Sequence, residues 1–101
     1  MNSFVTNLYM KPTTTATSQR LTPGTSTVAF FAELDVKTKA VSFDVQANDV
    51  FMTIDGSTPN TTNGHKLYAG RAYTLSSNSI EAAKFISASG SAVIFGSELT
   101  T

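Results

Sequence analysis

The sequence contains no cysteine and no tryptophan, and only 14% of its 101 residues are charged. Without cysteine the chain forms no disulfide and no thiolate-bound zinc or iron–sulfur site. Its formal net charge is zero, which argues against a basic surface for nucleic acid or for an anionic membrane. We therefore expect neither nucleic acid nor a membrane among its partners.

Long apolar runs are missing as well. No stretch approaches the ~18 consecutive apolar residues of a membrane-spanning helix. The first residues, MNSFVTNLYMKP, lack the charged and apolar regions of a secretory signal. Together with the absence of cysteine, this favours synthesis in a reducing cytoplasm. A chain of this length is expected to form one domain with a single core of modest size.

Hydroxyl side chains are abundant, because serine and threonine make up 28 of the 101 residues. Threonine favours strands, and short hydroxyl side chains satisfy backbone groups in turns. Seven phenylalanines and three tyrosines supply much of the expected core. This combination is typical of an extended, loop-rich β protein.

Alternating apolar residues predict the first strands of the domain. Residues 27–34 are apolar on both faces, which favours a central strand. In residues 40–47 the alternation is cleaner, with Val41, Phe43 and Val45 pointing inwards. The short charged connection between the two segments predicts an antiparallel hairpin.

Turn signals divide the second half of the chain into further short segments. Strands are expected at residues 50–55, 65–69, 71–75, 85–88 and 92–95, followed by a polar tail. The turns between them are assigned to Asp55, Gly56, Pro59, Asn63, Gly64, Gly70 and Gly90. Residues 80–84 favour helix by composition, but the segment is short and uncapped, so we predict an irregular lead-in to the next strand. Residues 89–91 are predicted to form a hairpin turn.

The N-terminal quarter of the chain has a different composition. Residues 10–26 hold two prolines, a threonine run and one aliphatic residue, Leu21. Such a segment buries too little apolar area to offset its ordering entropy. We interpret residues 1–26 as an N-terminal strand and an extended arm, either a loose leader or an arm that orders against a neighbouring subunit. Residues 27–101 are predicted to form the β domain.

Taken together, the pattern predicts an all-β fold: a single-domain antiparallel β-sandwich, or a small barrel, of about seven to eight short strands. Candidate chemistry is sparse. The single histidine, His65, lies beside a turn, and the neutral loop before it offers no orienting carboxylate, which favours a solvated residue over a catalytic or metal-binding one. Asp55 is a conceivable partner, but the turn that it starts with Gly56 explains it better. There is no phosphate-binding loop and no nucleophile elbow. We predict no enzymatic activity, no metal and no cofactor.

Aromatic residues offer one alternative function. Tyr68, Tyr73 and Phe51 would make a platform on which a sugar stacks, although core or interface positions are favoured for them. In that alternative the protein is a glycan-binding module that acts through the two tyrosines and the loop at residues 56–64.

Residues 50–95 carry a recognisable series of motifs: VFMTIDGSTP, then NGHKL, then AGRAYTL, and finally KFISASGSA. This series resembles small, cysteine-free β-sandwich proteins of tailed-bacteriophage virions, among them capsid decoration (cement) proteins and head- or tail-associated subunits. The resemblance rests on turn residues and points to no catalytic ones.

The resemblance implies a structural virion protein, in the first place a decoration protein that binds and stabilises the head shell. A head–tail or tail-associated subunit is the alternative within the virion. The implied partners are the major capsid protein or other virion proteins and further copies of the chain, with a trimer as the expected closed assembly. The implied location is the virion, after synthesis in the host cytoplasm. Candidate partner contacts are Lys11, Pro12, Arg20, Leu21, Tyr68 and Tyr73.

Overall fold

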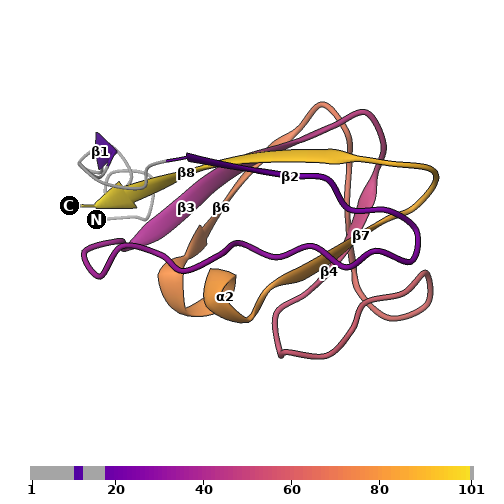
Figure 1. Ribbon diagram of the computed structural model, residues 1–101, viewed down its shortest axis with the longest axis horizontal. Coiled ribbons are helices and arrows are strands. Elements are labelled where there is room, and N and C mark those ends of the chain that lie inside the picture. Colours follow the sequence, from indigo (N-terminus) through magenta and orange to yellow (C-terminus); the bar gives the residue numbers. More distant parts are fainter. Residues whose placement is uncertain (1–10, 13–17, 101) are drawn as a thin grey trace, which may run out of the picture.

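The computed structural model describes residues 11–12 and 18–100. These residues form two antiparallel sheets and one short helix (Figure 1). The prediction of a small all-β antiparallel domain is confirmed. Because the two sheets share no hydrogen-bonded strands, the arrangement is sandwich-like.

The larger sheet, sheet A, consists of β1 (Lys11–Pro12), β2 (Ser18–Leu21), β3 (Ala40–Gln46), β6 (Ala72–Ser76) and β8 (Val93–Thr100). Strands β8 and β3 run side by side through its middle (Figure 1). Strand β6 is the end strand beyond β3, and β1 and β2 follow one another along the other side of β8. One edge of sheet A is therefore β6, and the other is shared by β1 and β2.

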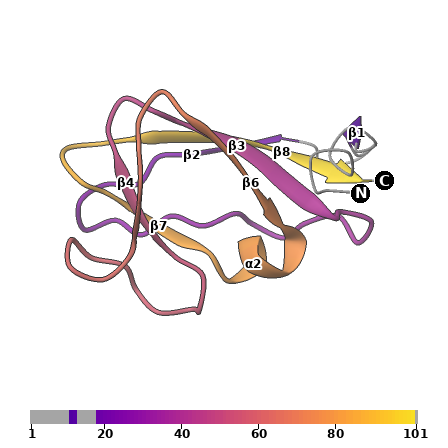
Figure 2. The same cartoon turned by 180° about the vertical axis from the view of Figure 1, so that it is seen from behind.

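The smaller sheet, sheet B, has the order β5-β4-β7, with β4 (Val50–Thr53) between β5 (His65–Leu67) and β7 (Lys84–Ser87). Ala29 extends this sheet beyond β7, because its backbone and that of Phe85 exchange two hydrogen bonds of 2.9 Å. Helix α2 (Ser77–Ala82) follows directly on β6 and contacts both β3 and β6 (Figure 2).

The core lies between the two sheets. Val41, Phe43 and Val45 of β3 are fully buried, as their alternation predicts. The rings of Phe43 and Phe85 meet edge-on at 5.6 Å, and the ring of Phe31 lies 6.0 Å from the first and 5.9 Å from the second. Burying one such side chain contributes roughly 1.5–3 kcal/mol, so this cluster is a main source of stability.

The predicted strand at residues 27–34 and its hairpin with residues 40–47 are wrong. Within that segment only Ala29 makes a ladder contact, while Phe31 enters the core and Phe30 is 58% exposed. The physical reason is that β3 is already paired on both sides, with β6 and with β8. Phe31 is the buried residue of residues 27–34, so this segment, which we call the plug, covers the core mainly through the Phe31 ring.

The predicted extended arm is corrected over residues 18–26. Strand β2 pairs with β8 from Ser18 opposite Ser97 to Leu21 opposite Ile94. Leu21 packs against the core, so this stretch belongs to the sandwich. Strand β8 provides the free edge that makes such pairing possible. Residues 1–10 and 13–17 of the predicted strand and arm lie outside the described residues.

Residues 77–82 form helix α2, which overlaps residues 80–84, where an irregular lead-in is predicted. Ser76 caps the helix, since its hydroxyl accepts a hydrogen bond from Ser79 N over 3.4 Å. Ile80 of this helix is fully buried. A helix this short is marginal on its own, and the burial of Ile80 stabilises it in the folded chain.

Two predictions near the C-terminus are also corrected. Strand β8 continues through the predicted polar tail to Thr100, and Glu98 within it is only 2% exposed. Residues 89–91 are not a hairpin turn, because they join β7 in sheet B to β8 in sheet A. Gly90 supplies a positive φ of 58° in this connection between the sheets.

Candidate interaction surface

The loop between β4 and β5 is held by the turn residues that the sequence singles out. Oδ1 of Asp55 accepts a hydrogen bond from Ser57 N over 3.0 Å and a second one from the Ser57 hydroxyl. These two bonds, the hydroxyl one foremost, lower the pKa of the exposed Asp55 carboxyl below its ordinary value. Gly56 follows with a φ of 84°. The turn expected at Asp55 and Gly56 is present, and the Asp55 side chain is its acceptor.

The second half of the same loop closes on itself. The backbones of Asn60 and Asn63 exchange hydrogen bonds of 3.0 and 3.2 Å, and Pro59 is buried. Gly64 then passes close to β4, where an added Cβ would lie 3.3 Å from the backbone oxygen of Met52. Asp55, Asn63 and Gly64 line one small hollow of about 240 Å³ together with His65, whereas Pro59 and Asn60 are not part of its lining.

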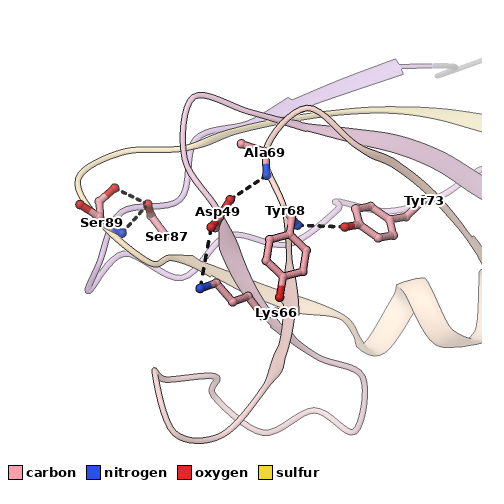
Figure 3. Close-up of polar contacts among 7 residues, drawn as sticks. All are labelled: Asp49, Lys66, Tyr68, Ala69, Tyr73, Ser87 and Ser89. Atoms are coloured by element: carbon pink, nitrogen blue, oxygen red, sulfur yellow. Dashed lines mark hydrogen bonds and ion pairs between the residues drawn. The ribbon is translucent and has the colours of Figure 1, made fainter.

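Tyr68 and Tyr73 are adjacent but have different surroundings (Figure 3). The ring of Tyr73 stacks on Phe43 at 5.7 Å, and its hydroxyl oxygen accepts a hydrogen bond from Tyr68 N over 2.9 Å. Tyr68 is 49% exposed, with Lys66 Nζ 5.6 Å and the Arg71 guanidinium 5.8 Å from its ring centroid. Tyr73 is thus partly buried against the core, and Tyr68 is the more exposed of the two rings.

Asp49 positions the turn that carries Tyr68 (Figure 3). One of its carboxylate oxygens accepts a hydrogen bond from Ala69 N over 2.8 Å, and the other lies 3.8 Å from Lys66 Nζ. Its backbone oxygen accepts a further bond from Ala88 N. An exposed ion pair contributes only ~0.2–1 kcal/mol, so Asp49 mainly orients the turn.

An apolar groove of about 340 Å³ opens between β6 at the end of sheet A and β4 and β5 of sheet B. We call it the edge groove. Its floor includes the buried side chains of Phe43, Met52 and Leu67, and Ile54 on its rim is 39% exposed. The remaining lining residues are His65, Tyr73, Thr74 and Leu75. Its lining is dominated by apolar side chains, which suits another apolar group.

The backbone of β6 beside this groove is half unpaired. Arg71 O accepts a hydrogen bond from β3 over 3.0 Å, and Ser77 N donates one of 2.9 Å to the residue that precedes β3. Because bonding direction alternates along an antiparallel strand, the backbone groups of Ala72, Thr74 and Ser76 face away from β3. Within the described part of the chain, no strand pairs with that outer side.

Strand β6 also lacks the features that usually protect a sheet edge. Its sequence, AYTLS, contains no charged residue and no proline. The opposite edge of sheet A carries Lys11, Pro12 and Arg20, and the three-residue edge strand β5 of sheet B carries Lys66. Compared with these two edges, the edge of β6 is both open and uncharged among the described residues.

The six predicted contact residues are not brought together. Lys11, Pro12, Arg20 and Leu21 lie in β1 and β2, whereas Tyr68 and Tyr73 lie beside β6 at the other edge of sheet A. Sequence reasoning missed Ile54 and Leu75, which line the edge groove. The uncharged run at residues 72–76 was the available signal, but its position at an edge is not visible in the sequence.

Comparison of the chain with protein-family models, with curated proteins and with solved structures finds no match. The resemblance to phage virion proteins therefore stays a prediction. In the described ranges, no helix is long and apolar enough to span a membrane. The same residues contain no cluster of three or more histidines and acids suited to a metal ion.

Proposed function

We propose that this chain is a structural virion subunit, and specifically a capsid decoration protein that binds the assembled head shell. The observation that carries the proposal is the open, uncharged edge of β6 beside the edge groove. Such an edge is completed when another polypeptide adds a strand, which supplies main-chain hydrogen bonds and fills the groove with side chains. An assembly subunit has such a neighbour, and a free-standing domain does not.

Charge and exposure support the same proposal. A net charge of zero favours self-association and precipitation of a free protein, but suits one that is packed among neighbours. Val36 is 96% exposed at the tip of a turn that is closed by a hydrogen bond of 2.9 Å from Thr38 N to Asp35 O. Phe30 and Phe95 are exposed on other parts of the surface. These side chains offer apolar contacts to more than one neighbour.

A decoration protein needs no chemistry to stabilise a shell. It binds a surface that exists only in the assembled shell. Its binding free energy therefore increases the free energy needed to take the shell apart. A head–tail or tail-associated subunit would use the same surfaces at another position in the particle. The glycan-binding alternative is less favoured. The Tyr73 ring stacks on Phe43, so only the Tyr68 ring is largely exposed for stacking on a sugar.

The proposal is tested on virus particles produced by cells that carry the gene for this chain. Sedimented in a density gradient, the chain should peak with the major shell protein at a constant molar ratio across the fractions. Shells from which it has been stripped should break at a lower temperature and regain their stability when the purified protein is added back. A chain that stays with the free soluble proteins, or that fails to restore the stripped shells, contradicts the proposal.

A further inference from the structure

We infer that the strand completing β6 is the β6 of a second copy of this chain, paired antiparallel across a two-fold axis. This deepens the proposed function and rests on it for the view that the edge is covered within an assembly. Three independent features of the edge are compatible with its own two-fold copy: backbone direction, side-chain pairing and charge.

The backbone direction sets the register. The outward-facing backbone groups that carry no partner among the described residues are the N–H and C=O of Ala72 and Thr74 and the N–H of Ser76. The C=O of Ser76 already accepts the first hydrogen bond of helix α2, because Ser76 is its N-cap. Ala72, Thr74 and Ser76 are therefore the residues that would form the hydrogen-bonded positions of any new ladder. A two-fold axis through the middle of β6 places Thr74 opposite Thr74 of the second copy. Their backbone groups then exchange hydrogen bonds at the axis, and Ala72 lies opposite Ser76 on either side of it.

The side chains are complementary in that register. Tyr73 and Leu75 both point towards the edge groove, and each would lie opposite the other residue type in the second copy. They form non-hydrogen-bonded pairs, in which facing side chains are closest, with Cβ atoms about 4.5–5.5 Å apart. Each copy would thus cover the groove of the other, and the two apolar cores would become continuous. The two Thr74 side chains pair on the outer face, a favourable cross-strand combination.

The charges are complementary as well. Strand β6 has no charge, so two copies meet there without repulsion. Just beyond its start, Arg71 would lie opposite Ser77 of the second copy, the first residue of α2. The exposed Glu81 follows one helical turn later on that copy. The two-fold axis repeats this approach of opposite charges at both ends of the paired strands.

This pairing uses the same edge of both copies, so it closes at two chains. The expected solution species is a dimer, and the trimer implied by the resemblance is not expected from this contact. Light scattering of the full chain, from micromolar to millimolar concentration, should show a twofold increase in mass. The amides of Thr74 and Ser76 should become protected from hydrogen exchange as the dimer forms, whereas those of Tyr73 and Leu75 already point to β3.

Thr74→Lys tests the axis directly, because it places two ammonium groups opposite each other. We expect this variant to remain monomeric. Ser42→Lys is the matched control: it adds the same charge on the same face, directly opposite Thr74, but on β3 and away from the new ladder. It should dimerise like the unmodified chain. Thr74→Pro is a second variant, which removes an amide that faces outwards and leaves the β3 ladder intact. Circular dichroism establishes that each variant is folded.

A chain that is monomeric at every concentration, a trimer, or a dimer that survives Thr74→Lys would each overturn the inference. The particle experiment distinguishes this failure from failure of the proposed function. If the chain is monomeric but still restores stripped shells, the dimer is contradicted and the decoration role is supported. If the chain forms a dimer that Thr74→Lys disrupts but never associates with particles, the β6 interface is supported and the decoration role is contradicted.

Discussion

At the scale of single residues, Glu98 is a buried acidic side chain in strand β8. Its Oε1 accepts hydrogen bonds from Asp35 N over 2.9 Å and from the Thr38 hydroxyl over 2.7 Å. Its Oε2 is buried without a hydrogen-bond partner. One carboxyl group thereby ties the exposed turn at residues 35–38 to the last strand of sheet A. The turn displays Val36, so Glu98 also orients a candidate contact residue.

Glu98→Ala should lower the free energy of unfolding by roughly 1–3 kcal/mol, because it leaves the Thr38 hydroxyl and Asp35 N–H without their acceptor. Glu98→Gln keeps an oxygen at the Oε1 position and should cost less. Urea unfolding of the three proteins measures the difference. Equal losses for both substitutions would mean that the hydrogen bonds to Oε1 do not account for the effect.

At the scale of elements, the contact between residues 27–34 and β8 explains how a segment without a strand is held. The ring of Phe31 lies directly over Gly96 of β8, where an added Cβ would come within 2.5 Å of the ring. The same Cβ would lie 3.2 Å from Val41. Nearby, the side chain of Gln19 in β2 makes two hydrogen bonds to the backbone of Ala32. The plug is therefore held by the Phe31 ring, which packs against Gly96, and by the two hydrogen bonds of the Gln19 side chain.

Gly96→Ala should destabilise the fold by about 1–3 kcal/mol, since the ring and the strand cannot both keep their positions. Ser97→Ala, one residue further along β8 and half-exposed, is the matched control and should be close to neutral. Adding Phe31→Leu to Gly96→Ala should cost less than the sum of the two single changes, because it removes the ring that clashes. Strict additivity in thermal unfolding would show that the ring is not the obstacle.

At the scale of the whole molecule, the sandwich is closed on one side and open on the other. Ala29, the plug and helix α2 cover part of the core, whereas the edge groove leaves the side between β6 and β5 open. The proposed dimer closes the open side of both copies at once. Folding and association are then linked, because only the folded chain presents the β6 edge.

This linkage predicts a melting temperature that depends on concentration. Where the dimer dominates, each tenfold rise in concentration should raise the melting temperature by about 3–5 °C for a domain of this size. Thr74→Lys should abolish the dependence, and Ser42→Lys should preserve it. Differential scanning calorimetry over a hundredfold range of concentration measures it. A constant melting temperature in the unmodified chain would contradict the link between folding and pairing.

Local signals in the sequence were sufficient for several features. The alternation in β3 predicts which of its residues are buried, and Asp55 with Gly56 predicts the turn that follows β4. Both depend on residues a few positions apart. The candidate surface was only partly predictable: the exposed Tyr68 was named, but the groove residues Ile54 and Leu75 were not.

The sequence by itself determined that this protein is a small β domain, that a turn lies at Asp55 and Gly56, and that the chain is rich in hydroxyls and poor in charge. Only the tertiary structure decided that β3 pairs with β6 and β8, that residues 18–21 join the sheet, that Ile80 stabilises a helix and that Glu98 is buried. The physical reason is that these outcomes are long-range: residues far apart in the chain compete for the same strand edges and the same core volume. The open edge of β6 is what that competition leaves unpaired among the described residues.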